Sequence, residues 1–161
     1  FARAVLERDL ARVIVLDTTD TAEVLQRLGD EAAALLAGDA RDATTLLVVP
    51  EGFGDFDDYL DLVGVAEALL SDLGHDGELQ IASFHPDYRF AGEDADDAAN
   101  CTNRAPYPML QLLQEGSVEQ ALEHHPDPAG IPTRNMEKMR TLGTGGIRAL
   151  LAPRTDETRI H

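Results

Sequence analysis

The side chains best suited to chemistry gather in one stretch, residues 84–110, which reads FHPDYRFAGEDADDAANCTNRAPYPML. About twenty of these residues show no regular periodicity, and such segments inside a compact domain are usually functional or disordered. The stretch combines imidazole, phenol, guanidinium, thiol and carboxamide groups, which are typical of sites rather than of linkers. These groups belong to His85, Tyr88, Arg89, Cys101, Asn103, Arg104 and Tyr107. The stretch therefore indicates where a site lies, but it names no reaction.

His85 is the candidate for acid–base catalysis or metal ligation, because imidazole exchanges protons near neutral pH. An equally weighted interpretation is structural: His85-Pro86 ends a strand, and the ring packs against the edge of the sheet. In the catalytic interpretation Glu51 or Asp17 orients the imidazole, and Tyr88 supplies a hydroxyl group. The candidate catalytic residues are therefore His85, Glu51 and Tyr88.

Arg104 precedes an expected helix start, where a guanidinium can hold a carboxylate or phosphate through two parallel hydrogen bonds. Together with Asn103, Tyr107 and Asp17 it forms the candidate ligand-binding set, and a small anionic ligand is expected. The alternative is that Arg104 pairs with acids of its own stretch, an interpretation slightly favoured in so acidic a protein. Those acids are Glu93, Asp94, Asp96 and Asp97.

No metal site is predicted, and the cofactor is unknown. The run from Asp94 to Asn100 resembles part of a calcium loop, but it lacks glycine at the sixth position and glutamate at the twelfth. The single cysteine, Cys101, has no matched histidine motif and is not predicted to be a nucleophile. The sequence contains no Walker loop, no G-x-G-x-x-G, no G-x-S-x-G and no C-x-x-C pattern.

Three apolar runs predict the strands that position these residues. They span residues 10–16, 44–49 and 79–84, and continuous apolar runs are typical of strands buried on both faces of a parallel sheet. Polar residues follow each run: Asp17 the first, Glu51 the second and His85 the third. Ligands of open parallel sheets bind outside the carboxyl ends of the strands. Parallel strands would therefore place the three polar loops at one edge of the sheet.

Amphipathic helices are predicted between the strands, over residues 20–38 and 56–74. The resulting β-α-β-α-β order predicts an α/β fold with a small, mainly parallel sheet and helices on both faces. The alternative fold is a two-layer α+β sandwich in which one strand runs antiparallel. Residues 1–153 are expected to form a single domain, and residues 154–161 a flexible tail.

Further helices are predicted after the long irregular stretch. One starts at Pro106 or Pro108 and runs through Leu113, with an interruption at Gly116. The next covers residues 117–125, because Ser117 and Gln120 form a capping-box pair. The last contains Met136, Met139 and Leu142 and breaks at residues 144–146. We expect these C-terminal helices to cover one face of the sheet.

Composition limits the classes of function. The chain has 161 residues and a formal net charge of −17, so its surface repels phosphate backbones and anionic membranes. Neither nucleic-acid binding nor membrane association is expected, and no apolar run reaches the length of a membrane span. One cysteine excludes an internal disulfide bond, which fits a reducing, cytoplasmic setting. The oligomeric state is not predicted.

Three segments, FHPDYRF, TNRAPYPMLQLL and IPTRNMEKMRTLG, resemble the bacterial proteins grouped as domain of unknown function 1415. The similarity spans nearly the whole chain, and NR-A-PYP is its most specific part. It implies an α/β fold and no particular reaction. Members of that family begin earlier, so we expect the natural chain to carry a segment ahead of Phe1. The candidates that the resemblance supports are His85, Asn103, Arg104, Tyr107 and Asn135.

Two functions from different classes follow from these observations. The slightly preferred one is an enzyme or small-molecule binder, of hydrolase or transferase type, with a pocket at the strand ends for an anionic ligand. The other is a protein-interaction or assembly module, in which the acidic surface and residues 85–106 bind a basic partner. Exposure of Tyr107 and Phe90 on an apolar patch would favour the second function.

Overall fold

The computed structural model describes residues 10–40, 43–123 and 127–151. The chain divides into two compact units: Phe1–Tyr88 with Asn103–Pro128, and Arg89–Thr102 with Ala129–His161. The flexible tail predicted at residues 154–161 lies outside the described residues, as does the predicted end of a helix at His125.

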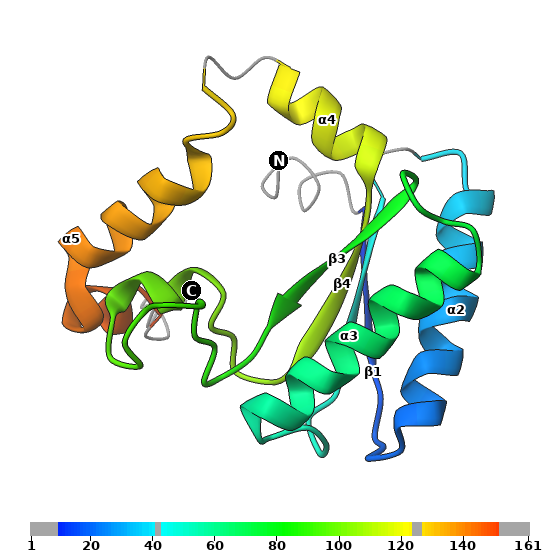
Figure 1. Cartoon of the computed structure of the whole chain (residues 1–161), viewed down its shortest axis with the longest axis horizontal. Helices are drawn as coiled ribbons and strands as arrows, with labels where there is room; N and C mark the ends of the chain where they lie inside the picture. Colours follow the sequence, from blue (N-terminus) through cyan, green and yellow to red (C-terminus); the bar gives the residue numbers. More distant parts are fainter. Residues whose placement is uncertain (1–9, 41–42, 124–126, 152–161) are drawn as a thin grey trace, which may run out of the picture. The chain divides into compact units, whose positions relative to one another are not determined.

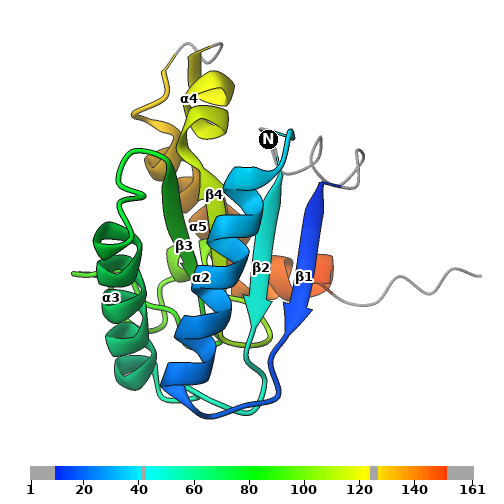
Figure 2. The ribbon, with the colours of Figure 1, turned by 90° about the vertical axis from the view of Figure 1, so that its right-hand side faces the viewer.

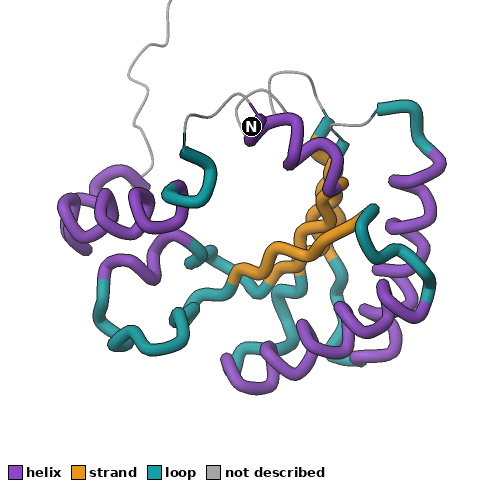
Figure 3. Tube along the Cα trace, turned by 45° about the horizontal axis from the view of Figure 1, so that its top comes forward, coloured by secondary structure: helices purple, strands orange, loops and turns teal. Residues whose placement is uncertain are grey.

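The first unit is built on one four-stranded sheet (Figures 1 and 3), and its strand order β1-β2-β4-β3 can be followed in Figure 2. Its strands are β1 (Ala11–Val15), β2 (Thr44–Val48), β3 (Leu79–Phe84) and β4 (Met109–Gln114). β1 and β2 pair in parallel, whereas β4 pairs antiparallel with both β2 and β3. Since β2 and β3 are each antiparallel to β4, the strands β1, β2 and β3 all run in the same direction. Their carboxyl ends lie at one edge of the sheet.

β4 corrects two sequence predictions. The helix expected from Pro106 or Pro108 through Leu113 is a strand, and the sheet is mixed rather than mainly parallel. Leu110 and Leu112 alternate onto the buried face, the period of two that a strand requires. A short apolar run does not by itself separate helix from strand. Here pairing with β2 on one side and β3 on the other decides in favour of the strand.

Two helices cover one face of this sheet. α2 (Thr21–Ala37) connects β1 to β2, and α3 (Phe56–Asp72) connects β2 to β3. Asp20 and Asp55 cap them, each accepting hydrogen bonds from backbone N–H groups of the first turn. Figure 2 shows both helices on the same side of the sheet. The reason is that the strand order advances in one direction, so right-handed crossovers place both helices on one side.

The hydrophobic core of this unit lies between the two helices and the sheet. Leu47 faces Leu110 across the β2–β4 pair, and both side chains are fully buried. Their helical counterparts are buried stripes that repeat every three to four residues along each helix. These stripes consist of Val24, Leu28, Ala32 and Leu35 on α2 and of Tyr59, Leu62, Ala66 and Leu70 on α3.

The C-terminal helices begin and break at positions different from those predicted. α4 (Glu115–Glu123) follows β4 directly and contains Gly116, which was expected to interrupt a helix. In the second unit, α5 (Ile131–Leu151) has its kink at Gly143, where φ is 64° and ψ is 166°, just ahead of the break expected at residues 144–146. Glycine adopts this left-handed backbone without steric cost.

The second unit also orders part of the stretch that appeared irregular in the sequence. A short 3-10 helix, η1 (Ala98–Thr102), packs against α5. Asn100 is fully buried: its side chain accepts from Phe90 N at 3.0 Å and donates to the Asp94 carbonyl at 2.8 Å. This amide therefore fixes the loop that leads into η1.

Candidate functional site

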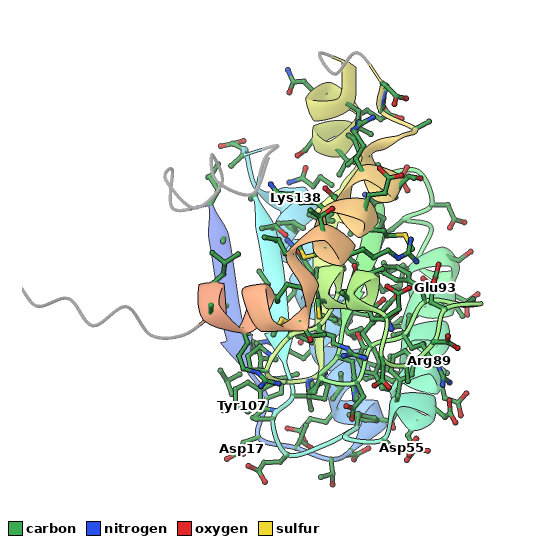
Figure 4. All side chains as sticks on the ribbon, turned by 90° about the vertical axis from the view of Figure 1, so that its left-hand side faces the viewer. Asp17, Asp55, Arg89, Glu93, Tyr107 and Lys138 are labelled. Carbon is green, nitrogen blue, oxygen red and sulfur yellow. The ribbon has the colours of Figure 1, made fainter. Side chains whose placement is uncertain are left out.

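Three loops meet at the carboxyl-terminal edge of the sheet in the first unit. They follow β1 at Asp17–Asp20, β2 at Pro50–Asp55 and β3 at His85–Tyr88. Figure 4 shows Asp17, Asp55 and Tyr107 together at this end of the unit. The common direction of β1, β2 and β3 creates this arrangement, although only β1 and β2 are adjacent parallel strands.

His85 is fully buried, and the protein main chain holds both of its ring nitrogens. The backbone N–H of Asp87 donates to Nδ1 at 3.0 Å, so this nitrogen presents a lone pair. Nε2 then carries the proton and donates to the Phe53 carbonyl at 3.0 Å. The ring is therefore neutral and is occupied on both sides. This geometry corresponds to the structural interpretation of His85 rather than to a base that faces a substrate.

Aromatic rings surround the imidazole. The ring centroids of Phe56 and Tyr59 lie 5.3 Å and 5.0 Å from that of His85, and Tyr88 lies 5.4 Å from Phe56. Tyr88 is half-buried in this cluster, so its ring serves packing. Glu51 and Asp17 are exposed, and the groups that orient the imidazole are backbone groups instead.

Tyr59 is a structural residue of the site that the sequence analysis did not single out. Its hydroxyl accepts from Phe84 N at 2.9 Å and donates to the Met109 carbonyl at 2.8 Å, joining the end of β3 to the start of β4. Burial raises the pKa of the Tyr59 hydroxyl well above its ordinary value. The available signal was a single tyrosine in an otherwise aliphatic helix stripe, since a buried tyrosine hydroxyl usually requires a partner.

The predicted ligand-binding residues after β3 also bind the main chain. Asn103 donates from Nδ2 to the Ser83 carbonyl at 3.1 Å, and Arg104 donates from Nε to the Tyr88 carbonyl at 3.1 Å. Backbone bonds between His85 and both Asn103 and Ala105 run alongside. These contacts hold residues 103–105 against the segment that follows β3. Tyr107, in contrast, is 49% exposed.

A cavity of about 410 Å³ opens at the ends of β1 and β2, and we call it the strand-end cavity. Its polar lining consists of two hydroxyl groups and two carboxylates, from Thr19, Thr21, Asp58 and Asp61. Its remaining lining is formed by Phe53, Gly54, Leu62 and Val65. No lysine, arginine or histidine side chain is among these lining residues. Of the seven predicted site residues, none lines this cavity.

The loop after β2 is held tightly beside the strand-end cavity. A Cβ on Gly52 would lie 3.0 Å from the Thr18 carbonyl oxygen and 3.2 Å from the Thr19 Cα, so a larger residue would push the two loops apart by a few tenths of an ångström. Phe53 adopts φ = 59°, a left-handed backbone that is uncommon for a bulky residue. Its carbonyl accepts the hydrogen bond from His85. Strained residues of this kind persist where the surroundings determine them, and they cluster at functional sites.

The helix N-termini at this edge are already occupied by carboxylates. Asp20 accepts from Ala22 N at 2.9 Å, and Asp55 accepts from Asp57 N and Asp58 N at 2.9 Å and 3.2 Å. A helix N-terminus attracts anions through its free N–H groups and its dipole. Because a negatively charged aspartate already accepts from one or two of these groups at each helix, the two N-termini are poor sites for an anionic ligand.

In the second unit, the acidic loop pairs with an arginine of α5. Arg140 binds Asp97 through Nε and Nη2, at 2.9–3.0 Å, and binds Glu93 at 2.7 Å. The hydrogen bonds from Arg140 lower the pKa of the Asp97 carboxyl group to about 2. Glu93 and Asp97 had been considered as partners for Arg104, and the structure pairs both with Arg140.

Metal-ligating clusters and membrane-spanning helices are both absent from the described ranges. There, no three histidine, cysteine, aspartate or glutamate side chains are close enough to hold a metal ion. Cys101 is a half-buried free thiol. Among the helices that the structure describes, none combines the length and the apolar character needed to cross a bilayer.

Comparison with known proteins identifies the family. Searches among curated proteins and among solved structures found no match. A family model described as "Protein of unknown function (DUF1415)" matches residues 1–149. This match confirms the resemblance carried by FHPDYRF, TNRAPYPMLQLL and IPTRNMEKMRTLG, and it covers most of the 161 residues. The chain therefore belongs to the family described as protein of unknown function (DUF1415).

Proposed function

We propose that this protein binds a small ligand in the strand-end cavity, and that the ligand presents a cationic or hydrogen-bond-donating group. The observation that carries the proposal is the lining of that cavity. Two carboxylates, of Asp58 and Asp61, and two threonine hydroxyls share a volume of about 410 Å³ with apolar side chains. Cavities of roughly 300–1,000 Å³ with a few convergent polar groups are typical small-molecule sites.

This proposal keeps a pocket at the strand ends, but its lining residues and the sign of the ligand charge differ from those expected from the sequence. An anion would meet the carboxylates of Asp58 and Asp61 with no basic side chain in the lining. It would also meet helix N-termini that Asp20 and Asp55 already cap. An amine or a polyhydroxylated molecule would instead find acceptors for its N–H or O–H groups. Electrostatics therefore favours a cationic or neutral ligand.

Binding is better supported than catalysis. His85, the predicted acid or base, has both ring nitrogens on backbone groups and is fully buried. Glu51 and Tyr88 are not among the residues that line the strand-end cavity. A general acid or base must reach the proton that it transfers. The hydrolase and transferase hypotheses thus lack a positioned catalytic group in this arrangement.

A thermal-shift experiment tests the proposal with a short alkyl diamine, a neutral polyol and a short dicarboxylate, all at equal ionic strength. Saturation at a hundred times Kd stabilises a protein by about 2.7 kcal/mol. We expect the diamine to raise the melting temperature most and the dicarboxylate not to raise it. Asp61→Asn should abolish the increase, because it removes one carboxylate of the cavity.

The matched control is Asp72→Asn, which makes the same charge change on α3 at an exposed position outside the cavity lining. This variant should respond to the diamine as the unmodified protein does. If both variants lose the diamine-dependent increase in melting temperature equally, the increase comes from general attraction between the diamine and the acidic protein rather than from binding in the cavity. Stabilisation by the dicarboxylate instead of the diamine would restore the anionic ligand predicted from the sequence.

Exposure of Tyr107 supports a second candidate function, a protein-interaction module. Its side chain is 49% exposed, as a binding anchor requires, whereas Phe90 is half-buried. The acidic surface would select a basic partner. Capture of a stoichiometric partner from native lysate, lost in Tyr107→Ser and kept in Tyr88→Phe, would support this candidate. Recovery of no stoichiometric partner would reject it.

A further inference from the structure

We propose that His85 is a proton-sensitive positioning residue for the wall of the strand-end cavity, and that acid releases the Phe53 backbone from it. The two hydrogen bonds of the His85 ring, to the Phe53 carbonyl and from the Asp87 N–H, are called the His85 bridge. This inference rests on the proposed function in one respect: release of residues 52–54 would regulate ligand binding in the strand-end cavity. The bridge itself stands on the geometry alone.

The His85 bridge admits only a neutral imidazole. A backbone N–H is always a donor, so the Asp87 contact at 3.0 Å requires a lone pair on Nδ1. A second ring proton would place N–H against N–H at this contact. It would also create a positive charge on a side chain with no exposed surface, and burying a charge is costly unless it is paired.

The surroundings provide little compensation for such a charge. From α3, the rings of Phe56 and Tyr59 face the imidazole, and neither carries a negative charge that could pair with an imidazolium. Burial raises the pKa of Tyr59, which keeps its hydroxyl neutral. From residues 103–105 the nearest charged group is the Arg104 guanidinium, which binds the Tyr88 carbonyl. On the segment that follows β3, the Asp87 carboxylate is exposed. Among the described residues, no ion pair involves His85.

Release of the His85 bridge changes the cavity because its other end is Phe53. Phe53 lines the cavity and is held at φ = 59°, a backbone that a bulky L-residue leaves when its surroundings allow. Its carbonyl accepts the bond from Nε2 at 3.0 Å. The bridged state excludes a second proton from the His85 ring, whereas the released state accepts it. Lowering the pH therefore shifts the equilibrium between these two states. Acid therefore favours the state in which residues 52–54 are released.

Nuclear magnetic resonance of the whole chain tests this inference without any ligand. Long-range proton–nitrogen spectra should report His85 as the neutral Nε2–H tautomer at pH 7.5. Amide-exchange protection at residues 52–54 should then fall as the pH is lowered from 7.5 into the acid range, by up to about tenfold per pH unit for one coupled proton. Protection of the β2–β4 amides should stay unchanged over the same range.

Two variants separate the proton effect from a structural one. His85→Gln keeps an N–H donor for the Phe53 carbonyl but does not titrate, so protection at residues 52–54 should become independent of pH. His75→Gln is the matched control, because His75 lies beside Glu78 in the same unit, and it should behave as the unmodified protein does. If His85→Gln does not fold, the spectra of the unmodified protein still decide the question.

The inference is overturned if Nδ1 carries a proton at pH 7.5, or if His85 becomes doubly protonated while residues 52–54 keep their protection. It is equally overturned if His85→Gln retains the pH dependence. Failure of the proposed function has a different signature, because the diamine would then not stabilise the protein at any pH while the exchange behaviour persisted. Stabilisation by the diamine without pH-dependent exchange would leave the function intact and remove the His85 bridge as its regulator.

Discussion

The polar side chains at the carboxyl-terminal edge of the sheet form hydrogen bonds mainly with backbone groups. The imidazole of His85, the hydroxyl of Tyr59 and the amide of Asn103 each bind backbone groups. Such groups lie where the strands end and the regular ladder no longer pairs every N–H and C=O. Buried backbone groups without partners are costly, so side chains at strand ends often provide the missing bonds. Residue types that are typical of catalytic sites can therefore have a structural role, in which they satisfy the hydrogen bonds of backbone groups.

Tyr59→Phe should lower the free energy of unfolding by about 1–3 kcal/mol, because it leaves Phe84 N–H and the Met109 carbonyl without the hydroxyl that joins them. Urea denaturation followed by circular dichroism measures the loss. The control is Tyr107→Phe, which removes a hydroxyl from a side chain that is 49% exposed. Equal stability of the two variants would contradict the structural role of the Tyr59 hydroxyl.

The same hydroxyl predicts an alkaline limit to stability. Burial raises the folded-state pKa of Tyr59 above the unfolded value of about 10. The neutral phenol therefore contributes its full stabilisation below about pH 10, and this contribution is lost as the pH rises further. The free energy of unfolding should fall more steeply above pH 10 in the unmodified protein than in Tyr59→Phe.

Arg104→Ala should lower the melting temperature of the ligand-free protein, at a cost of about 1–2 kcal/mol, because the Nε bond to the Tyr88 carbonyl is lost. Arg104→Lys should restore little of it, since lysine lacks the planar fork of donors. Limited proteolysis should find residues 85–106 cleaved faster in the alanine variant. An unchanged melting temperature combined with weaker binding of a carboxylate probe would support the anion anchor instead.

At the scale of elements, one arginine links two segments that are far apart in sequence. The loop before η1 supplies Glu93 and Asp97, and α5 supplies Arg140. Paired hydrogen bonds between a guanidinium and a carboxylate are stronger and more directional than neutral bonds. The side chain of Arg140 is 42% exposed, so the link orients the loop more than it stabilises the fold.

Attachment of this loop to α5 should weaken in acid. The pKa of Asp97 is lowered to about 2, chiefly by the hydrogen bonds from Arg140. For a carboxyl group with a depressed folded-state pKa, the stabilisation is present above the unfolded value of about 3.9 and is lost as the pH falls toward 2. Amide exchange of residues 93–97 should therefore increase between about pH 4 and pH 2, relative to intrinsic rates.

Arg140→Gln should expose the loop to protease at neutral pH, where the unmodified protein resists. Arg148→Gln is the matched control, because Arg148 lies exposed on the same helix and its substitution removes the same charge. It should leave the cleavage rate of residues 89–102 unchanged. If both variants are cleaved equally fast, the protease resistance of the loop depends on the net charge of α5 and not on the specific bonds from Arg140 to Asp97 and Glu93.

At the scale of the whole molecule, the dominant quantity is the net charge of −17. Like charges on one folded chain repel each other and destabilise the compact state. Salt screens this repulsion, with a Debye length of about 10 Å at 0.1 M. The melting temperature should therefore rise when sodium chloride increases from about 0.02 M to 0.3 M. Potassium chloride should act equally, and a fall in melting temperature with both salts would contradict the screening argument.

The local elements were determined largely by the sequence alone. The helices over 21–37 and 56–72 and the strands β1, β2 and β3 lie where periodicity and capping residues predicted them. Such signals involve residues within one or two turns of each other, so no distant partner is needed to interpret them. The family was also recognisable, because the segment around Asn103–Arg104–Tyr107 is specific enough to identify it.

Only the tertiary structure decided the direction of β4, the side of the sheet that α2 and α3 cover and the hydrogen-bond partners of His85. β4 is a strand because β2 and β3 flank it, and those partners lie about 65 and 30 residues away along the chain. The partner of the His85 Nε2 atom is the Phe53 carbonyl, 32 residues earlier. A one-dimensional pattern records which groups a chain carries but not which distant backbone atom each one meets. For that reason the sequence located the edge of the sheet where the polar residues gather, and the fold determined what they bind.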